Sequence, residues 1–100
     1  MREGETMNIR EAMRGLLAQS GLDELGELLR IKECWPGLVG EKMAGETKPY
    51  RLEGGKLYIG VQSHAWAQEM HYHIGEIKRA IKEETGTEIS DVIIRKINLK

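Results

Sequence analysis

Residues 50–62, YRLEGGKLYIGVQ, carry the pattern that decides the fold. Apolar side chains recur there at every second position on either side of Gly54-Gly55, namely at Tyr50, Leu52, Leu57, Ile59 and Val61. A period of two is typical of β-strands that bury one face. Glycine accepts the positive φ values that a tight turn between two strands requires. The stretch therefore predicts a β-hairpin whose apolar side chains face a core.

Helical periodicity precedes the hairpin. Asn8, followed three residues later by Glu11, resembles a capping box and predicts a first helix that ends at Ser20-Gly21. A second helix is expected from about Leu22 to Cys34, because one apolar stripe recurs at Leu25, Leu28, Leu29 and Trp35. Pro36-Gly37 is expected to interrupt this helix, since proline has no N–H to donate and clashes with the preceding turn. A short further helix is expected over 38–44.

The longest helix is expected after the hairpin. Ser63 is a candidate N-cap and Gly86 a candidate C-terminal stop. Between them an apolar stripe recurs at helical spacing, at Trp66, Met70, Ile74, Ile77 and Ile81, and predicts a single helix over 64–85. Residues 92–99 are rich in β-branched residues and predict a last strand with Ile93, Ile97 and Leu99 facing the core.

These elements predict an α+β domain with the order α-α-β-β-α-β. The hairpin strands run antiparallel, whereas the last two strands are joined by a crossover helix and are expected to run parallel. The result is a three-stranded mixed sheet that helices cover on one face. Residues 1–7 are expected to form a flexible lead-in, and residues 8–100 a single domain.

Composition and motifs favour a binding protein over an enzyme. The 100 residues carry a net charge of −1 and a single cysteine, Cys34, which fits a reducing cytoplasm. No apolar run is long enough to cross a membrane, and the sequence holds no phosphate-binding loop or nucleophile motif. His71 and His73, two residues apart on the expected helix, point away from each other. Neither a metal site nor another cofactor is expected.

One face of the predicted sheet is left for a ligand. With the apolar positions turned inward, the opposite face carries the candidate nucleic-acid contacts Arg51, Lys56, Tyr58, Lys96 and Lys100. The cations would neutralise phosphates and the tyrosine ring would stack on a base. A solvated face whose edge lysines prevent aggregation is an equally open interpretation. A second candidate basic face lies on the long helix, at Lys78, Arg79 and Lys82.

Two further features have both a functional and a structural interpretation. The residues Gly37–Gly40 match the letters GxxG, which in KH domains mark a loop that joins two helices and clamps a nucleic-acid backbone. Leu38 and Val39 within it carry no donor for phosphate, so a helix end with both side chains packed inward is favoured. Trp35 and Trp66 lie on apolar helix stripes and are interpreted as core residues.

Four ordered motifs resemble a known family. They are W-P-x-x-V-G-E-x-x-A at 35–44, T-x-P at 47–49, G-x-L-x-I-x-V-x-S-x-A-W-A-Q-E-M at 55–70, and I-x-L at 97–99. Together they resemble the DciA family of bacterial replicative-helicase loaders over about residues 22–100. The resemblance implies a KH-like domain that binds single-stranded DNA and the hexameric replicative helicase, and that promotes helicase loading at the nucleoid. A KH-like domain that binds RNA and a protein-interaction adapter without nucleic-acid binding stay open as alternatives.

Overall fold

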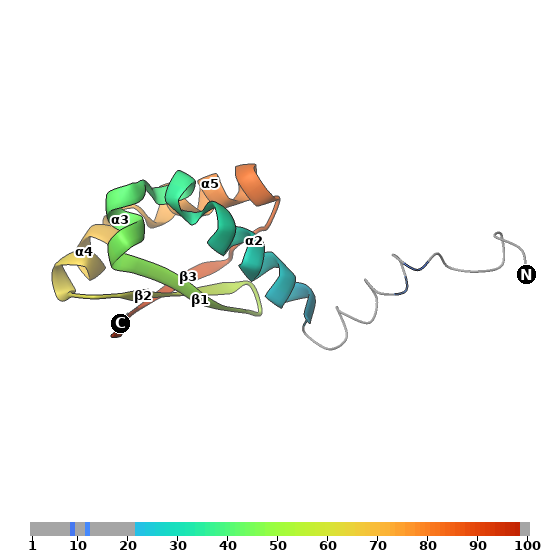
Figure 1. The fold of residues 1–100 in the computed structure, drawn as a ribbon, viewed down its shortest axis with the longest axis horizontal. Helices are drawn as coiled ribbons and strands as arrows, with labels where there is room; N and C mark the ends of the chain where they lie inside the picture. Colours follow the sequence, from blue (N-terminus) through green and yellow to red (C-terminus); the bar gives the residue numbers. More distant parts are fainter. Residues whose placement is uncertain (1–8, 10–11, 13–21, 99–100) are drawn as a thin grey trace, which may run out of the picture.

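The computed structural model describes residues 22–98 together with Ile9 and Ala12. Apart from these two residues, which are helical, the first helix expected from Asn8 to Ser20 lies outside the described residues. The elements that follow are two helices, a hairpin, two more helices and a last strand, with the helices gathered on one face of the sheet (Figure 1). The expected α+β fold with a mixed sheet is confirmed.

The sheet has the order β1-β2-β3, formed by β1 (Thr47–Glu53), β2 (Lys56–Val61) and β3 (Asp91–Lys96). β1 pairs with β2 antiparallel, and β2 pairs with β3 parallel, as the hairpin and the crossover connection predict. Gly54 and Gly55 form the hairpin turn with φ values of 60° and 80°, a conformation that side chains with a Cβ rarely adopt.

The helix before the hairpin is longer than expected. α2 (Leu22–Val39) runs through Pro36, and the chain breaks only at Gly40, which has a φ of 94°. Proline costs the helix one backbone hydrogen bond near its end, but the Gly40 N–H still donates to the Pro36 carbonyl at 2.8 Å. α3 (Glu41–Glu46) follows directly. The predicted interruption at Pro36-Gly37 is therefore wrong, and glycine at 40 sets the break.

The single helix expected over 64–85 is two helices. α4 (His64–Tyr72) begins at Ser63, whose hydroxyl accepts the Trp66 N–H, and α5 (Ile74–Thr85) ends at Gly86 with a left-handed φ of 76°. The break lies at His73, with φ −108° and ψ 10°. The apolar stripe continues across the break, so periodicity did not reveal it. The local residues Tyr72, His73 and Gly75 are all poor helix formers.

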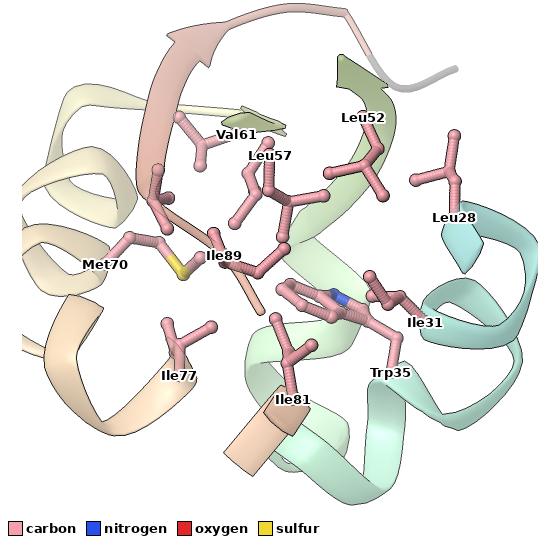
Figure 2. Close-up of a cluster of buried hydrophobic side chains, with 12 residues drawn as sticks. Leu28, Ile31, Trp35, Leu52, Leu57, Val61, Met70, Ile77, Ile81 and Ile89 are labelled. Carbon is pink, nitrogen blue, oxygen red and sulfur yellow. The ribbon is translucent and has the colours of Figure 1, made fainter. Parts of the chain in front are cut away.

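The core lies between the helices and the inner face of the sheet (Figure 2). From α2 it takes Leu28, Ile31 and Trp35, whereas Leu25 and Leu29 of the expected stripe are exposed. The Trp35 indole N–H donates to the Thr47 hydroxyl at 3.1 Å, and this hydroxyl donates to the Met43 carbonyl at 2.7 Å. The hydrogen-bonded chain joins α2, α3 and β1 inside the core, where an unpaired polar group would cost stability. Trp35 is a core residue as predicted.

The inward set of β3 differs from the predicted one. Val92 is buried and Ile94 packs against the core, whereas Ile93 and Ile97 are half-buried outside it. Parallel pairing of Leu57 with Val92 and of Ile59 with Ile94 sets this parity. Because three apolar residues follow one another at 92–94, alternation alone did not identify the buried face. The expectation that Ile93 and Ile97 face the core is wrong, and Leu99 lies outside the described residues.

Candidate nucleic-acid interface

The face of the sheet turned away from the helices is called the open face here. Exposure along the three strands and the strand register assign it the following residues: Lys48, Tyr50, Arg51, Glu53, Lys56, Tyr58, Gly60, Asp91, Ile93 and Arg95. The strand register arranges most of them in three rows across the sheet, Glu53–Lys56–Asp91, Arg51–Tyr58–Ile93 and Lys48–Gly60–Arg95. Each row has its own chemistry.

The middle row is aromatic and cationic. A β-bulge between Pro49 and Arg51 inserts one extra residue, so that both Tyr50 and Arg51 lie opposite Tyr58. The Tyr50 and Tyr58 rings are 6.1 Å apart between centroids, and the Arg51 guanidinium carbon is 5.3 Å from the centroid of the Tyr58 ring. The expectation that Tyr50 faces the core is therefore wrong, because the bulge turns it to the open face.

Arg51 also makes an ion pair along its own strand. Its Nη2 lies 2.5 Å from Oε1 of Glu53, and both side chains are more than half exposed. An exposed pair of this kind contributes little to stability and is readily exchanged for another anion. Arg51 is thus placed to contact either a phosphate or the face of a neighbouring ring.

The two outer rows differ in charge. Lys56 lies between Glu53 on one neighbouring strand and Asp91 on the other, so opposite charges flank it on both sides. Lys48 and Arg95 instead lie on either side of Gly60, with no acidic residue in their row. Positive charge on the open face is therefore concentrated in Lys48, Arg51 and Arg95, called the cationic cluster below.

The apolar side chain of Ile97 lies over Gly60, between Lys48 and Arg95. A Cβ added at Gly60 would lie 2.0 Å from Cδ1 of Ile97, so the Ile97 side chain occupies the space above this glycine. The Ile97 N–H donates to the Val61 carbonyl at 2.9 Å and holds the chain beside β2 after the end of β3. Ile97 thus adds an apolar contact to the open face between two cations.

The sequence-predicted contacts are placed as follows. Arg51 and Tyr58 lie side by side on the open face, and Lys56 lies there among acids. Lys96 shares the parity of Val92 and Ile94, so its expected place on the open face is wrong, although it is exposed at the end of β3. Lys100 lies outside the described residues.

Sequence reasoning missed Lys48, Tyr50 and Arg95. Arg95 was missed because the sequence analysis assigned the wrong face of β3 to the core. Lys48 was missed because the apolar alternation starts only at Tyr50, three residues after the first residue of β1. Tyr50 was assigned to the core because the bulge that turns it to the open face was not predicted.

The alternative basic face lies on α5, within the helix layer. Lys78 is half-buried, Arg79 and Lys82 are exposed, and the Lys82 ammonium is 3.6 Å from a carboxylate oxygen of Glu88. In the described part of the chain, none of these three residues makes a cation–π contact with an aromatic ring. The letters GxxG lie at the end of α2, where Leu38 and Val39 pack against the core as the structural interpretation predicts.

One histidine, His73, forms an ion-pair cluster on the helix layer. His73 lies between two carboxylates, with Nδ1 2.7 Å from Glu76 Oε1 and Nε2 3.3 Å from Glu69 Oε2. The hydrogen bond to Glu76, and then that to Glu69, raises the pKa of His73 above its usual 6.5. Among residues 22–98, no three His, Cys, Asp or Glu side chains converge in a way that would hold a metal ion. None of the helices in this range is long and apolar enough to cross a membrane.

Comparison with known proteins agrees with the resemblance noted in the sequence. The family model described as Dna[CI] antecedent, DciA, matches residues 8–94. The search of curated proteins gave no match.

Proposed function

The chain belongs to the DciA family, whose members are accessory factors associated with loading of the replicative helicase, and we propose that it binds single-stranded DNA through the open face while it engages that helicase. The family is not a catalytic one, which fits a binding role. The role in DNA replication comes from the family, whereas the DNA surface is inferred from the side chains of this chain.

The observation that supports DNA binding is the combination of cations and rings on the open face. Non-specific single-strand binding needs cations that follow a phosphate backbone and aromatic rings on which bases stack. The cationic cluster supplies the first, and the pair Tyr50 and Tyr58, 6.1 Å apart, supplies the second. Ile93, which lies opposite Tyr58, and Ile97, which covers Gly60, add apolar surface to this face. The basic face on α5 has cations without rings.

The proposal retains two of the five contacts expected from the sequence as central, Arg51 and Tyr58. Lys56 contributes less, because Glu53 and Asp91 repel a phosphate that approaches it. Lys96 is exposed at the end of β3 but has the parity of the opposite face, so it is left out of the proposed contact. Lys100 stays a predicted nucleic-acid contact.

Binding by this surface alone is expected to be weak. Three cations neutralise few phosphates, and the whole chain carries a net charge of −1. The helicase would supply the missing contacts by holding the DNA close to the open face. We therefore expect tighter DNA binding in the ternary complex than by the isolated chain.

A charge-reversal experiment tests the DNA surface. We expect Lys48→Glu/Arg95→Glu to weaken binding of a fluorescent single-stranded oligonucleotide at least tenfold, with an unchanged melting curve. The matched control, Lys78→Glu/Lys82→Glu, reverses two charges on α5 and should bind like the parent protein. Loss of binding in the control alone would move the site to the helix layer.

A second experiment separates the proposal from its alternatives. The chain is titrated into the replicative helicase of its host with and without single-stranded DNA, and RNA of equal length serves as competitor. Helicase binding that DNA strengthens supports the proposal. Preference for RNA without helicase binding would indicate an RNA-binding domain, and helicase binding without any nucleic-acid effect would indicate an adapter.

A further inference from the structure

The helix layer contains a groove of its own. Two adjoining hollows of about 610 and 320 Å³ share Val39 and Met43 in their walls. Residues of the α2–α3 junction and of the start of α4 line the first hollow, and residues from the end of α2, from α3 and from α5 line the second. The shared residues make them two parts of one groove, which we call the helix groove.

The floor of the helix groove is apolar and adaptable. Val39, Met43 and Trp66 line the first part, and Leu38, Ile77 and Ala80 the second. Trp66 was expected in the core; it packs against the core but is only half-buried, and its remaining surface faces this groove. A partly buried tryptophan beside a flexible methionine is typical of a surface that buries a partner's apolar side chains.

The rim of the groove is acidic. Glu41, Glu69 and Glu76 line it, against Lys42 and His73. His73 contacts both Glu69 and Glu76 and holds these two carboxylates beside the floor. Glu84 follows Ala80 by four residues and so continues the acidic side along α5. A negative rim around an apolar floor attracts a cationic partner and orients it.

We propose that the helix groove binds a basic amphipathic helix of a partner protein. An extended segment would gain no main-chain hydrogen bonds here, because the walls are helices whose backbone groups are already paired. A helix satisfies its own backbone and inserts an apolar stripe between the walls, while its Lys and Arg side chains pair with Glu41, Glu69 and Glu76.

A second copy of the described chain does not offer such a helix. α5 carries Lys78, Arg79 and Lys82, but its apolar residues Ile77 and Ile81 are buried in its own core. The inference is independent of the proposed DNA site, since the groove lies on the helix layer and the cationic cluster on the opposite side of the sheet. A negative result for the helix groove therefore does not affect the proposed DNA site, and a negative result for the DNA site does not affect the groove.

The test uses the whole chain and a designed probe. The probe is a fluorescent helical peptide of about 18 residues, with leucines on one face and lysines elsewhere, and its counterpart carries glutamates in place of the lysines. Binding is measured by anisotropy, and the site by ¹H–¹⁵N NMR shifts. We expect the basic peptide to bind with shifts at Val39, Met43 and the Trp66 indole, and the acidic peptide not to bind.

Variants separate the rim from general charge effects. Glu41→Lys/Glu69→Lys should weaken the basic peptide about tenfold or more. Glu33→Lys/Glu88→Lys, which reverses two exposed charges outside the groove, should leave the affinity within about twofold. Ala65→Gln, at an exposed position in the groove wall, should weaken binding by occlusion without a change in net charge.

Several results would overturn the proposal. They are no binding of the basic peptide, equal binding of both peptides, or shifts confined to the open face. Concentration-dependent shifts of the groove residues in the free protein would show instead that a second copy of the chain occupies the groove.

Discussion

The substitution Tyr58→Ala tests whether the open face stacks on bases. Tyr58 lies at the centre of this face, half-buried, with the Tyr50 ring at 6.1 Å and the Arg51 guanidinium at 5.3 Å. No core residue is removed, so the variant should remain folded. Its loss of DNA affinity then reports what the ring contributes to binding.

The magnitude follows from two opposing contributions. Stacking of a base on an aromatic ring is worth about 1–3 kcal/mol by alanine substitution. A base that takes the ring face displaces Arg51, and an exposed cation–π contact of this kind is worth about 0.5–1 kcal/mol. The remainder is about 0.5–2 kcal/mol, which corresponds to an affinity roughly 2- to 30-fold weaker.

The assay is anisotropy of a labelled single-stranded oligonucleotide at low salt, with a melting curve of each variant. Tyr72→Ala is the matched control, because Tyr72 is 85% exposed but lies on α4 in the helix layer. We expect this control to bind DNA like the parent protein. If Tyr72→Ala weakens binding while Tyr58→Ala does not, the reasoning about the open face is refuted.

Three further predictions address charge, protonation and folding. The logarithm of the DNA-binding constant should fall with the logarithm of salt concentration with a slope of about −2, from ~0.7 per phosphate for the cationic cluster, and a slope near zero would exclude this surface. Glu76→Gln should lower the pKa of His73 more than Glu69→Gln does in an NMR titration, since the Glu76 hydrogen bond is the main cause of the raised pKa. Because the folded-state pKa of His73 lies above 6.5, protonated His73 stabilises the fold below pH 6.5, and this contribution is lost as the pH rises through the folded-state pKa. Glu76→Gln should therefore lower the free energy of unfolding below pH 6.5. An unchanged free energy of unfolding of the variant at that pH would contradict this prediction. Thr47→Val should cost about 1–3 kcal/mol in urea unfolding, because the buried Trp35 N–H loses its acceptor, and a loss below about 0.5 kcal/mol would show that this bond is dispensable.

The hairpin and the crossover could be predicted from the sequence because they rest on local patterns. Gly54-Gly55 and the alternation at 57–61 identify the turn and the buried face of β2 without tertiary information. Ser63 and Gly86 act through bonds to neighbouring residues, and both occupy the predicted cap positions. The parallel pairing of β3 follows from the connection through the helices.

The remaining features depend on contacts between distant residues. Pairing with β2 decides which residues of β3 face the core. This pairing places Arg95 on the open face and Lys96 on the opposite one, the reverse of the prediction. The bulge at Tyr50 has no sequence signature, yet it brings a second ring to Tyr58. The helix groove forms where α3 approaches α4 and α5, and its lining residues are spread from 38 to 80. The sequence therefore predicted which face of the sheet is left for a ligand, but it identified only some of the residues on that face.

The most direct test of the central claim is an NMR titration of the ¹⁵N-labelled chain with a single-stranded oligonucleotide of about 15 nucleotides. The account predicts that the largest amide shifts cluster on the open face, at Arg51, Tyr58 and Arg95, while amides of α5 remain unchanged. Shifts confined to Lys78, Arg79 and Lys82, or no shifts at a large excess of DNA, would contradict it.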